Sequence, residues 1–390
     1  MRGHVRKRGS LWAVVVDLPH DPVTGKRRQK WHSGFKIRRD ADRALTDILS
    51  RLNQGAYIAP SKKTLSEFLD EWLADTKDTI RASTYATYET MIRTQIKPRI
   101  GNVRLPDLNS FVLNEFYRVL LASGRKDGKG GLSPATVRYA HSVLRKALND
   151  ALRANLVPRN VADAARPPRV PGAKIRTWSA RELRTFLDHV EGDRLYAAYV
   201  VAATTGMRRG EVLGLRWQDL DLDAGRASVS QTLIVVGGYD VQFSEPKTAR
   251  GRRSVALDPH TVKALREHRE RQMLERSLMG DAYDDQDLVF SREDGTPLHP
   301  DAFSDAFWRH AKAAKLPRIR FHDLRHTHAT LALAAGVHPK VVSERLGHAS
   351  ITITLDTYSH AIPAMQETAA SLVAALVFDA EVWDTRAHGA

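Results

Sequence analysis

Four short motifs in the second half of the chain carry side chains that could act on a phosphate group. They are Thr205–Glu211 (TGMRRGE), Lys247, His322–Arg325 (HDLR) and Leu346–His360 (LGHASITITLDTYSH). The forked guanidinium of arginine matches phosphate oxygens, lysine and histidine can move protons, and a tyrosine oxygen can act as a nucleophile. Each motif alone is more often structural, because arginine pairs, hairpin lysines and terminal tyrosines are common in surfaces and cores.

The order and joint presence of these motifs strongly resemble the tyrosine recombinase (phage integrase) family. Every signature position of that family is filled between residues 178 and 365. By this resemblance the catalytic residues would be Arg208, Glu211, Lys247, His322, Arg325, His348 and Tyr358. The resemblance implies an enzyme that links its tyrosine to the 3′ phosphate of a cut DNA strand and leaves a free 5′ hydroxyl, so that religation needs no ATP.

The charged groups have distinct expected roles in such a reaction. Arg208 and Arg325 would hold the phosphate oxygens, and His348 would be a third donor. Lys247, in a connection between strands, would protonate the leaving 5′ oxygen. Glu211 would hold Arg208 or a neighbouring histidine in place.

The expected nucleophile is Tyr358, whose hydroxyl has an ordinary pKa near 10. Nearby arginines would favour its phenolate, and His322 would accept its proton. Three further histidines near the motifs, His326, His328 and His360, as well as Arg209, are interpreted as supporting residues rather than catalysts.

We expect no metal ion and no other cofactor. The chain has no cysteine, and its histidines do not form an H-E-x-x-H motif. The acidic residues near the motifs are too few and too scattered for a two-metal nuclease site. The absence of cysteine also excludes disulfides and thiolate metal sites, which fits a cytoplasmic location.

The positive charge of the chain is concentrated in its first 170 residues. The whole chain of 390 residues has a formal net charge of +15, whereas residues 1–60, 61–170 and 171–390 have net charges of +8, +8 and −1. Two successive basic segments favour binding to a polyanion such as double-stranded DNA. A basic protein that is merely soluble is the alternative.

Residues 1–58 are predicted to form a small α+β domain, with strands at Leu11–Leu18 and Lys26–Ser33 and a helix at Arg39–Asn53. The resemblance makes this a three-stranded arm-type DNA-binding domain. Arg27, Arg28 and Lys30 lie beside Trp31 and are candidate DNA contacts, because strands can enter a major groove. The alternative is an exposed charged hairpin with a core tryptophan.

Residues 62–165 are predicted to be helical, and the resemblance makes them a core-binding (SAM-like) domain. A capping box at Thr64–Glu67, a helix beginning at Ser83, a helix at Phe111–Leu121 and an N-cap at Ser133–Pro134 mark the helices. Two arginines of the last helix are candidate DNA contacts, with a solvated face as the alternative: Arg138 and Arg145.

A Pro-rich linker at 166–177 should precede a catalytic domain at 178–365, mostly helical with a small β insert, and a tail at 366–390. The insert is predicted from strands at Arg226–Val236 and Arg253–Leu257. An apolar helix at 369–377 would pack on its own domain in a monomer, or on a neighbouring protomer in an assembly. The whole chain is therefore predicted to be mainly α and multidomain.

The function that we expect is that of a mobile-element or phage integrase. It would act as a tetramer on two DNA attachment sites, and a directionality or DNA-bending accessory protein could be needed. The alternatives are a type IB topoisomerase with the same chemistry and a non-catalytic DNA-binding regulator on the same scaffold. No apolar stretch is long enough for a membrane helix, and no membrane partner is expected.

Overall fold

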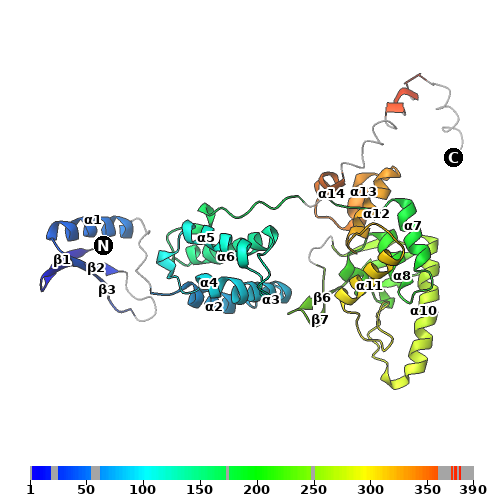
Figure 1. The fold of residues 1–390 in the computed structure, drawn as a ribbon, viewed down its shortest axis with the longest axis horizontal. Coiled ribbons are helices and arrows are strands. Elements are labelled where there is room, and N and C mark those ends of the chain that lie inside the picture. Colours follow the sequence, from blue (N-terminus) through cyan, green and yellow to red (C-terminus); the bar gives the residue numbers. More distant parts are fainter. Residues whose placement is uncertain are drawn as a thin grey trace. The chain divides into compact units, whose positions relative to one another are not determined.

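The structure is a computed structural model of the chain and describes residues 2–18, 25–53, 62–172, 175–246, 251–358, 370–371, 373–375 and 377–378. The chain divides into two compact units, Met1–Gly172 and Ala173–Ala390 (Figure 1). As predicted, it is mainly helical, with a three-stranded sheet near the N-terminus and small sheets in the second unit. None of the helices in the described ranges is both long and apolar enough to cross a membrane.

Three antiparallel strands and one helix form the N-terminal module. The strands are ordered β1-β2-β3 and precede the helix: β1 (Gly3–Arg8), β2 (Leu11–Leu18), β3 (Arg28–Phe35) and α1 (Arg38–Asn53). The central strand is buried on both faces, because Val14 and Val16 pack with Ala41 of α1 while Ala13 and Val15 are also buried. The pattern of residues predicted β2, β3 and α1, whereas only the family resemblance implied a third strand.

Two cations that are close to Trp31 in the sequence, Arg28 and Lys30, lie on the other face of the sheet from it. Arg28 and Lys30 pair with residues of β2 whose side chains pack against α1 or lie on its side of the sheet, so they share that face. Trp31 lies on the opposite face and is 43% exposed, so the alternative of a core tryptophan is wrong, whereas the predicted DNA contacts of the three cations stay a prediction. Arg27 is already paired, with Nη2 2.8 Å from Oδ1 of Asp17.

The helical part of the first unit encloses its own core. Its helices are α2 (Leu65–Thr76), α3 (Ala82–Met91), the π-helical η1 (Ile92–Ile96), α4 (Lys97–Ile100), η2 (Leu105–Asp107), α5 (Ser110–Ser123), α6 (Pro134–Arg153) and η3 (Val161–Ala164). The capping box at Thr64 and the N-cap at Ser133 are confirmed. The second helix begins at Ala82 rather than Ser83. Its N-cap residue is Arg81, whose side chain makes no capping hydrogen bond with the first turn.

The two arginines predicted to contact DNA from α6 differ in their surroundings. Both side chains belong to exposed residues on the same helix. Arg145 donates from Nε to Oδ1 of Asp163 at 2.7 Å, whereas no side-chain bond of Arg138 is found within the described part of the chain. Exposed pairs of this kind contribute little stability, so Arg145 can exchange its carboxylate for a phosphate at small cost.

The second unit is a helical body with small sheets. Its helices are α7 (Ala180–His189), α8 (Tyr196–Thr205), α9 (Arg209–Leu213), η4 (Trp217–Asp219), α10 (Pro259–Met279), η6 (Gly280–Ala282), α11 (Pro300–Ala313), α12 (Asp323–Ala334), α13 (Pro339–Leu346) and α14 (Ile351–Tyr358). The predicted capping box at Ser179 starts α7. Trp178 is buried, donates from Nε1 to the Pro317 carbonyl at 2.9 Å, and packs against Phe186 and Phe307. This aromatic core holds the helices that carry the candidate site.

The predicted strand at Arg226–Val236 is two strands in different sheets. These are β5 (Arg226–Val229), in the order β4-β5-β8 with β4 (Leu220–Asp221) and β8 (Arg253–Ala256), and β6 (Thr232–Val236), which pairs only with β7 (Asp240–Ser244). The prediction missed β7 and the break at Ser230, whose side chain donates to Asp219.

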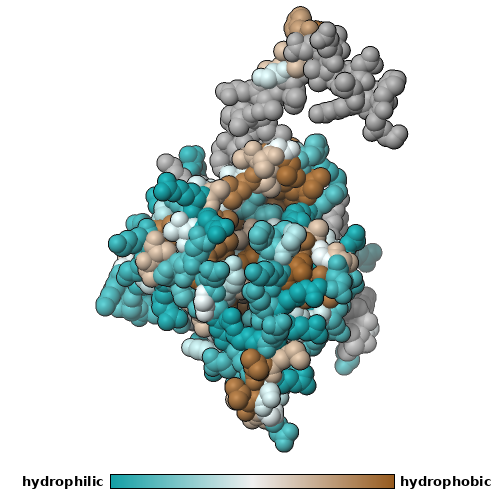
Figure 2. Space-filling model, turned by 90° about the vertical axis from the view of Figure 1, so that its right-hand side faces the viewer, coloured by the Kyte–Doolittle hydropathy of each residue, from teal (hydrophilic) through white to brown (hydrophobic). Residues whose placement is uncertain are grey.

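The exposed apolar side chains of the second unit include one group near the end of α10 and another in the tail. Figure 2 shows a mostly hydrophilic face, and Met273, Leu274 and Leu278, near the end of α10, are 64%, 67% and 87% exposed. In the tail, residues 370–371, 373–375 and 377–378 are helical, and Ala369 lies outside the described residues. Val373 and Val377 are 60% and 64% exposed, so these side chains do not pack on their own domain as expected for a monomer.

Candidate active site

The turn between α8 and α9 positions Arg208. Helix α8 is apolar and buried, and it ends at Gly206, which adopts φ = +66°. A Cβ atom at Gly206 would lie 2.6 Å from Cδ2 of Leu346 and 2.8 Å from Cδ2 of His328. Both the left-handed backbone and the close packing therefore require glycine here. Arg208 follows as the N-cap residue of α9.

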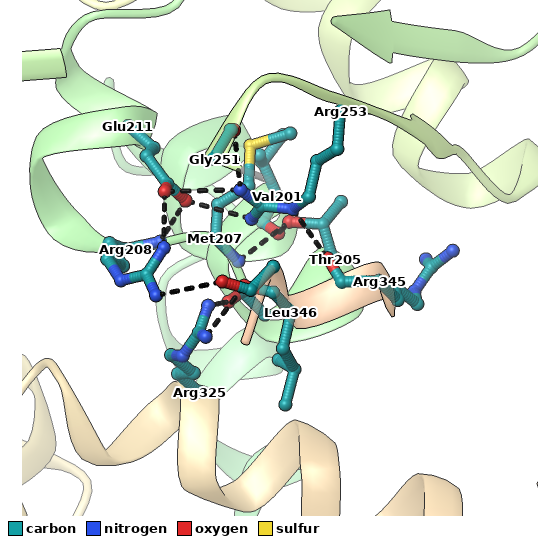
Figure 3. Close-up of polar contacts among 12 residues, drawn as sticks. Val201, Thr205, Met207, Arg208, Glu211, Gly251, Arg253, Arg325, Arg345 and Leu346 are labelled. Carbon is teal, nitrogen blue, oxygen red and sulfur yellow. Dashed lines mark hydrogen bonds and ion pairs between the residues drawn. The ribbon is translucent and has the colours of Figure 1, made fainter. Parts of the chain in front are cut away.

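Glu211 holds Arg208 through both the backbone and the side chain (Figure 3). The Arg208 N–H donates to Oε2 of Glu211 at 2.9 Å, and its Nη1 donates to Oε1 at 2.7 Å. The side chain of Glu211 is 4% exposed, whereas that of Arg208 is 41% exposed. The carboxylate thus anchors a guanidinium that remains open to solvent on one side.

A second arginine, Arg253 of β8, also binds Glu211. Its Nη2 donates to Oε2 at 2.9 Å and its Nη1 to Oε1 at 3.2 Å, and the Arg253 side chain is only 7% exposed. Burial alone would raise the pKa of Glu211, but the hydrogen bonds and charges of Arg253 and Arg208 outweigh it and the pKa is lowered. Sequence analysis missed Arg253, because one arginine in a basic stretch carries no signal of burial.

Arg325 is almost entirely enclosed on α12. It is 3% exposed, and it donates from Nη1 to the Gly206 carbonyl at 2.8 Å and from Nη2 to the Leu346 carbonyl at 2.7 Å (Figure 3). Burial, followed by the charge of Arg208, lowers its pKa to about 9, so the group is still protonated at neutral pH. Two of its five N–H donors are used by backbone carbonyls, which leaves the others for a ligand.

Three side chains from α12 and α13 bind the carbonyl end of α8. His328 Nδ1 lies 3.1 Å from the Ala203 oxygen, and Arg345 Nη2 donates to the Thr204 oxygen at 3.0 Å. With Arg325 on Gly206, the last carbonyls of α8 therefore face donors from two neighbouring helices. These contacts satisfy groups that a helix C-terminus leaves unpaired and place cations at its negative end.

His348 lies just after the left-handed Gly347 that ends α13. Its Nδ1 is 2.8 Å from Oγ1 of Thr354 on α14. Burial, and then the charges of Arg325 and Arg208, lower the pKa of His348 to about 4. The ring is therefore neutral at physiological pH, and it is a donor only through the nitrogen that carries its proton.

Tyr358 ends α14 and is 1% exposed, packed with Leu346 and Val342 of α13. Its hydroxyl is 2.7 Å from Nδ1 of His326. Burial raises the pKa of Tyr358 to about 12, although the charge of Arg325 acts in the opposite direction. The phenol is therefore protonated at rest and needs a proton acceptor before it can act as a nucleophile.

His322 does not occupy the position that sequence analysis gave it. It makes no hydrogen bond with Tyr358, and it instead sets its ring edge-on to that of His326, with 5.2 Å between the ring centroids. His322 belongs to the exposed residues, and yet desolvation by the surrounding protein, with the charges of His326 and Arg325, lowers its pKa to about 4. The residue that contacts the Tyr358 hydroxyl is His326, which sequence analysis interpreted as a supporting residue.

The structure thus brings Arg208, Glu211, Arg325 and His348 around the Leu346–Gly347 turn. Lys247 and His360 lie outside the described residues. Arg209 points elsewhere, since its Nη1 donates to Ser304 and to the Pro300 carbonyl. In the ranges that the structure covers, no three His, Asp or Glu side chains are grouped closely enough to hold a metal ion.

Three family models match successive parts of the chain. Residues 4–52 match an "Arm DNA-binding domain", residues 64–121 match "Phage integrase, N-terminal SAM-like domain", and residues 177–365 match "Phage integrase family". The last range includes every described residue of the candidate site. The order of the three matches is that expected from the sequence.

Individual proteins resemble the chain over nearly its whole length. A tyrosine recombinase XerC-like protein of Caldanaerobacter subterraneus is 26% identical and the match covers 94% of this chain and 96% of that protein. The ICEBs1 integrase of Bacillus subtilis is 25% identical, over 91% of this chain and 95% of that protein.

Two solved structures show the same fold at low sequence identity. The Tn1549 transposon integrase in complex with a circular intermediate DNA has a TM-score of 0.66 and 22% identity, and the match covers 80% of this chain and 99% of that chain. A lambda integrase tetramer bound to a Holliday junction has a TM-score of 0.55 and 19% identity, over 89% and 96% of the two chains.

Proposed function

Because the chain belongs to the tyrosine recombinase family of phage and mobile-element integrases, we propose that Tyr358 cuts and rejoins DNA at attachment sites while Arg208 and Arg325 hold the phosphate. Site-specific recombination is the activity of this family. The proposal adds to it the assignment of the chemistry to particular residues of this chain.

The convergence of two guanidinium groups on one backbone turn carries the proposal. Arg325 Nη2 is 2.7 Å from the Leu346 oxygen and Arg208 Nη2 is 3.4 Å from the Gly347 oxygen, although the two arginines are far apart in the sequence. Burial is the main cause of the lowered pKa of Arg325, and the like charge of Arg208 acts in the same direction. A protein that holds two cations together in this way provides a site for a dianion-like transition state.

The steps follow from the groups present. The phosphate oxygens would bind the free donors of Arg208 and Arg325, with His348 as a third donor. The Tyr358 oxygen would then attack phosphorus and form a 3′-phosphotyrosine, and the 5′ oxygen would leave with a proton, for which Lys247 is our candidate donor. A 5′ hydroxyl from the partner duplex would reverse these steps. Glu211 would hold Arg208 in place throughout.

The partners that we propose are two duplex attachment sites and further copies of this chain, assembled as a tetramer. The net charge of +8 in each of the first two segments supports duplex binding. The exposed apolar side chains of the tail helix support docking on a neighbouring protomer. A directionality or DNA-bending protein is a further candidate partner.

Replacing Tyr358 with phenylalanine tests the proposed function. We expect Tyr358→Phe to form no covalent adduct with a nicked duplex built from an attachment repeat that flanks the gene, because the nucleophilic oxygen is gone while the ring still fills its apolar cluster. Adduct formation is read on a denaturing gel, and duplex binding serves as the control. An adduct at the wild-type level would remove Tyr358 from the mechanism.

A reaction with two attachment sites distinguishes recombination from the two alternatives. A type IB topoisomerase would relax supercoiled DNA without exchanging strands between paired sites. A non-catalytic regulator would bind the duplex without forming any adduct. Exchange of flanking sequences between the two sites supports the integrase.

Deletion of the N-terminal module tests its proposed role in binding a second, distal DNA site. We expect removal of residues 1–58 to weaken binding to distal arm sites more than cleavage at the core site, because the residues of the candidate active site lie in the second unit. Binding to each DNA element is measured by gel shift, in parallel with adduct formation. An equal loss of both would contradict the two-site hypothesis.

A further inference from the structure

The hydroxyl of Tyr358 has one close polar neighbour in the described structure, and that neighbour is His326. The distance from Nδ1 to the hydroxyl oxygen is 2.7 Å, within the range of a good hydrogen bond. The two rings are tilted by 53° with their centroids 5.6 Å apart. His326 therefore touches the oxygen that would react.

The environment of His326 favours a neutral ring that can accept a proton. Burial lowers the pKa of His326, Arg325 and Arg320 act in the same direction, and only Asp323 opposes them. With its pKa below the ordinary value of 6.5, the imidazole is mainly uncharged at neutral pH. A neutral imidazole has one nitrogen without hydrogen, and the observed geometry allows Nδ1 to be that nitrogen.

The helix α12 explains why His326 and not His322 reaches the hydroxyl. Residues four apart in a helix lie on the same face. His322, however, is the N-cap residue and precedes the first residue of α12. His326 is one turn further along, where α14 brings Tyr358 against the helix. The His322 ring instead packs edge-on against the His326 ring.

We propose that His326 is the general base of the cleavage step and takes the proton of Tyr358 as its oxygen attacks phosphorus. The inference rests on the proposed function of Tyr358. As the tyrosine O–H bond breaks, the new O–P bond forms and the proton goes to Nδ1 of His326. The bond from phosphorus to the 5′ oxygen breaks, and that oxygen takes its proton from the general acid of the proposed function. On religation the imidazolium returns the same proton to the tyrosine oxygen, so that no other reactant is consumed.

The test uses the full-length protein with His326→Ala, and two substrates. One is the nicked attachment-repeat duplex, and the other is the same duplex with sulfur in place of the bridging 5′ oxygen at the scissile phosphate. A thiolate leaves without a proton donor, so sulfur relieves the loss of a general acid but not that of a general base. His260→Ala, an exposed histidine on α10, is the matched control.

We expect His326→Ala to lower the rate of adduct formation by about a hundredfold on both substrates, which is within the usual range for a general base. Added imidazole should restore a measurable part of that rate, because it can occupy the space left by the ring. His260→Ala should react at the wild-type rate. Gel-shift affinity for the oxygen duplex should be the same for all these proteins and shows that each is folded.

Several outcomes would overturn the assignment. A wild-type rate for His326→Ala, full restoration of that rate by the sulfur substrate, or a loss that imidazole does not relieve would each remove His326 as the base. Imidazole rescue of His322→Ala in place of His326→Ala would transfer the role to His322. If Tyr358→Phe still forms an adduct, the proposed function fails instead, and the two failures are thus distinguishable.

Discussion

Replacement of Arg325 with alanine is expected to abolish adduct formation while duplex binding persists. Removal of one donor aimed at developing charge typically costs a hundredfold to a thousandfold in rate. The loss of rate for Arg325→Ala should be at the upper end of that range, because Arg325 also donates hydrogen bonds to the carbonyls of Gly206 and Leu346. Duplex affinity should change little, since it depends on many phosphate contacts along the chain.

Substitution of Arg325 with lysine tests whether the positive charge alone is sufficient, or whether the planar guanidinium group is needed. Arg325→Lys keeps a cation but cannot bridge two carbonyls and a phosphate with one planar group. We expect Arg325→Lys to melt closer to the wild type than Arg325→Ala does but to regain little of the cleavage, as measured by thermal melting and by the gel assay for the adduct. Arg208→Ala should also lose cleavage, with less effect on melting because Arg208 is partly exposed. Undiminished cleavage by either alanine variant would contradict the proposed phosphate clamp.

Replacement of Arg253 with methionine is expected to destabilise the catalytic unit strongly. The Glu211 and Arg253 side chains are 4% and 7% exposed, and removal of one partner of a buried pair costs about 3–5 kcal/mol. Arg208 can still bind Glu211, so the lower end of that range is the more realistic expectation. Calorimetry of the full-length variant should show a lower melting temperature for the transition of the catalytic unit.

A second substitution provides the control for Arg253→Met. Adding Glu211→Leu removes the carboxylate that has lost Arg253 as its partner, so the melting temperature should recover in part. Cleavage should fall further, because Arg208 loses its hydrogen bonds with Glu211. The pKa of Glu211 is lowered, so its stabilising contribution is present above the ordinary value of 4.5 and is lost as pH falls through the lowered pKa. The deficit of Arg253→Met should therefore shrink in acid. A deficit that grows in acid would contradict the ion pair.

The sequence predicted much of the fold because local signals agreed with the final structure. The capping boxes at Thr64 and Ser179 start helices as expected, and the apolar run at Leu11–Leu18 is a strand. The sheets of the second unit were harder to predict, because β5 and β6 are nearly continuous in sequence. The pairing of strands depends on contacts between segments that are distant in sequence, and the periodicity of apolar residues gives no information on such contacts.

The sequence motifs proposed members for the candidate site, but they gave no information on the contacts of those residues. Arg208, Arg325 and Tyr358 were identified from their motifs, yet their burial and partners depend on packing. His322 is the N-cap residue of α12, and His326 lies one turn further along the helix. Only the position of α14 decides which of the two meets Tyr358. Arg253 had no motif, and its role appears only once β8 is folded against α9.

The positive charges of this protein lie in two different environments, one buried at Arg325 and the other at the surface of the first 170 residues. The Arg325 guanidinium is enclosed and held on the carbonyls of Gly206 and Leu346, so dissolved ions hardly screen it. The cations of the first 170 residues are mostly at the surface, where attraction to a duplex weakens as ionic strength rises. Capture of DNA is thereby left sensitive to the salt of the medium, while the electrostatic environment of the reacting phosphate is set when the chain folds.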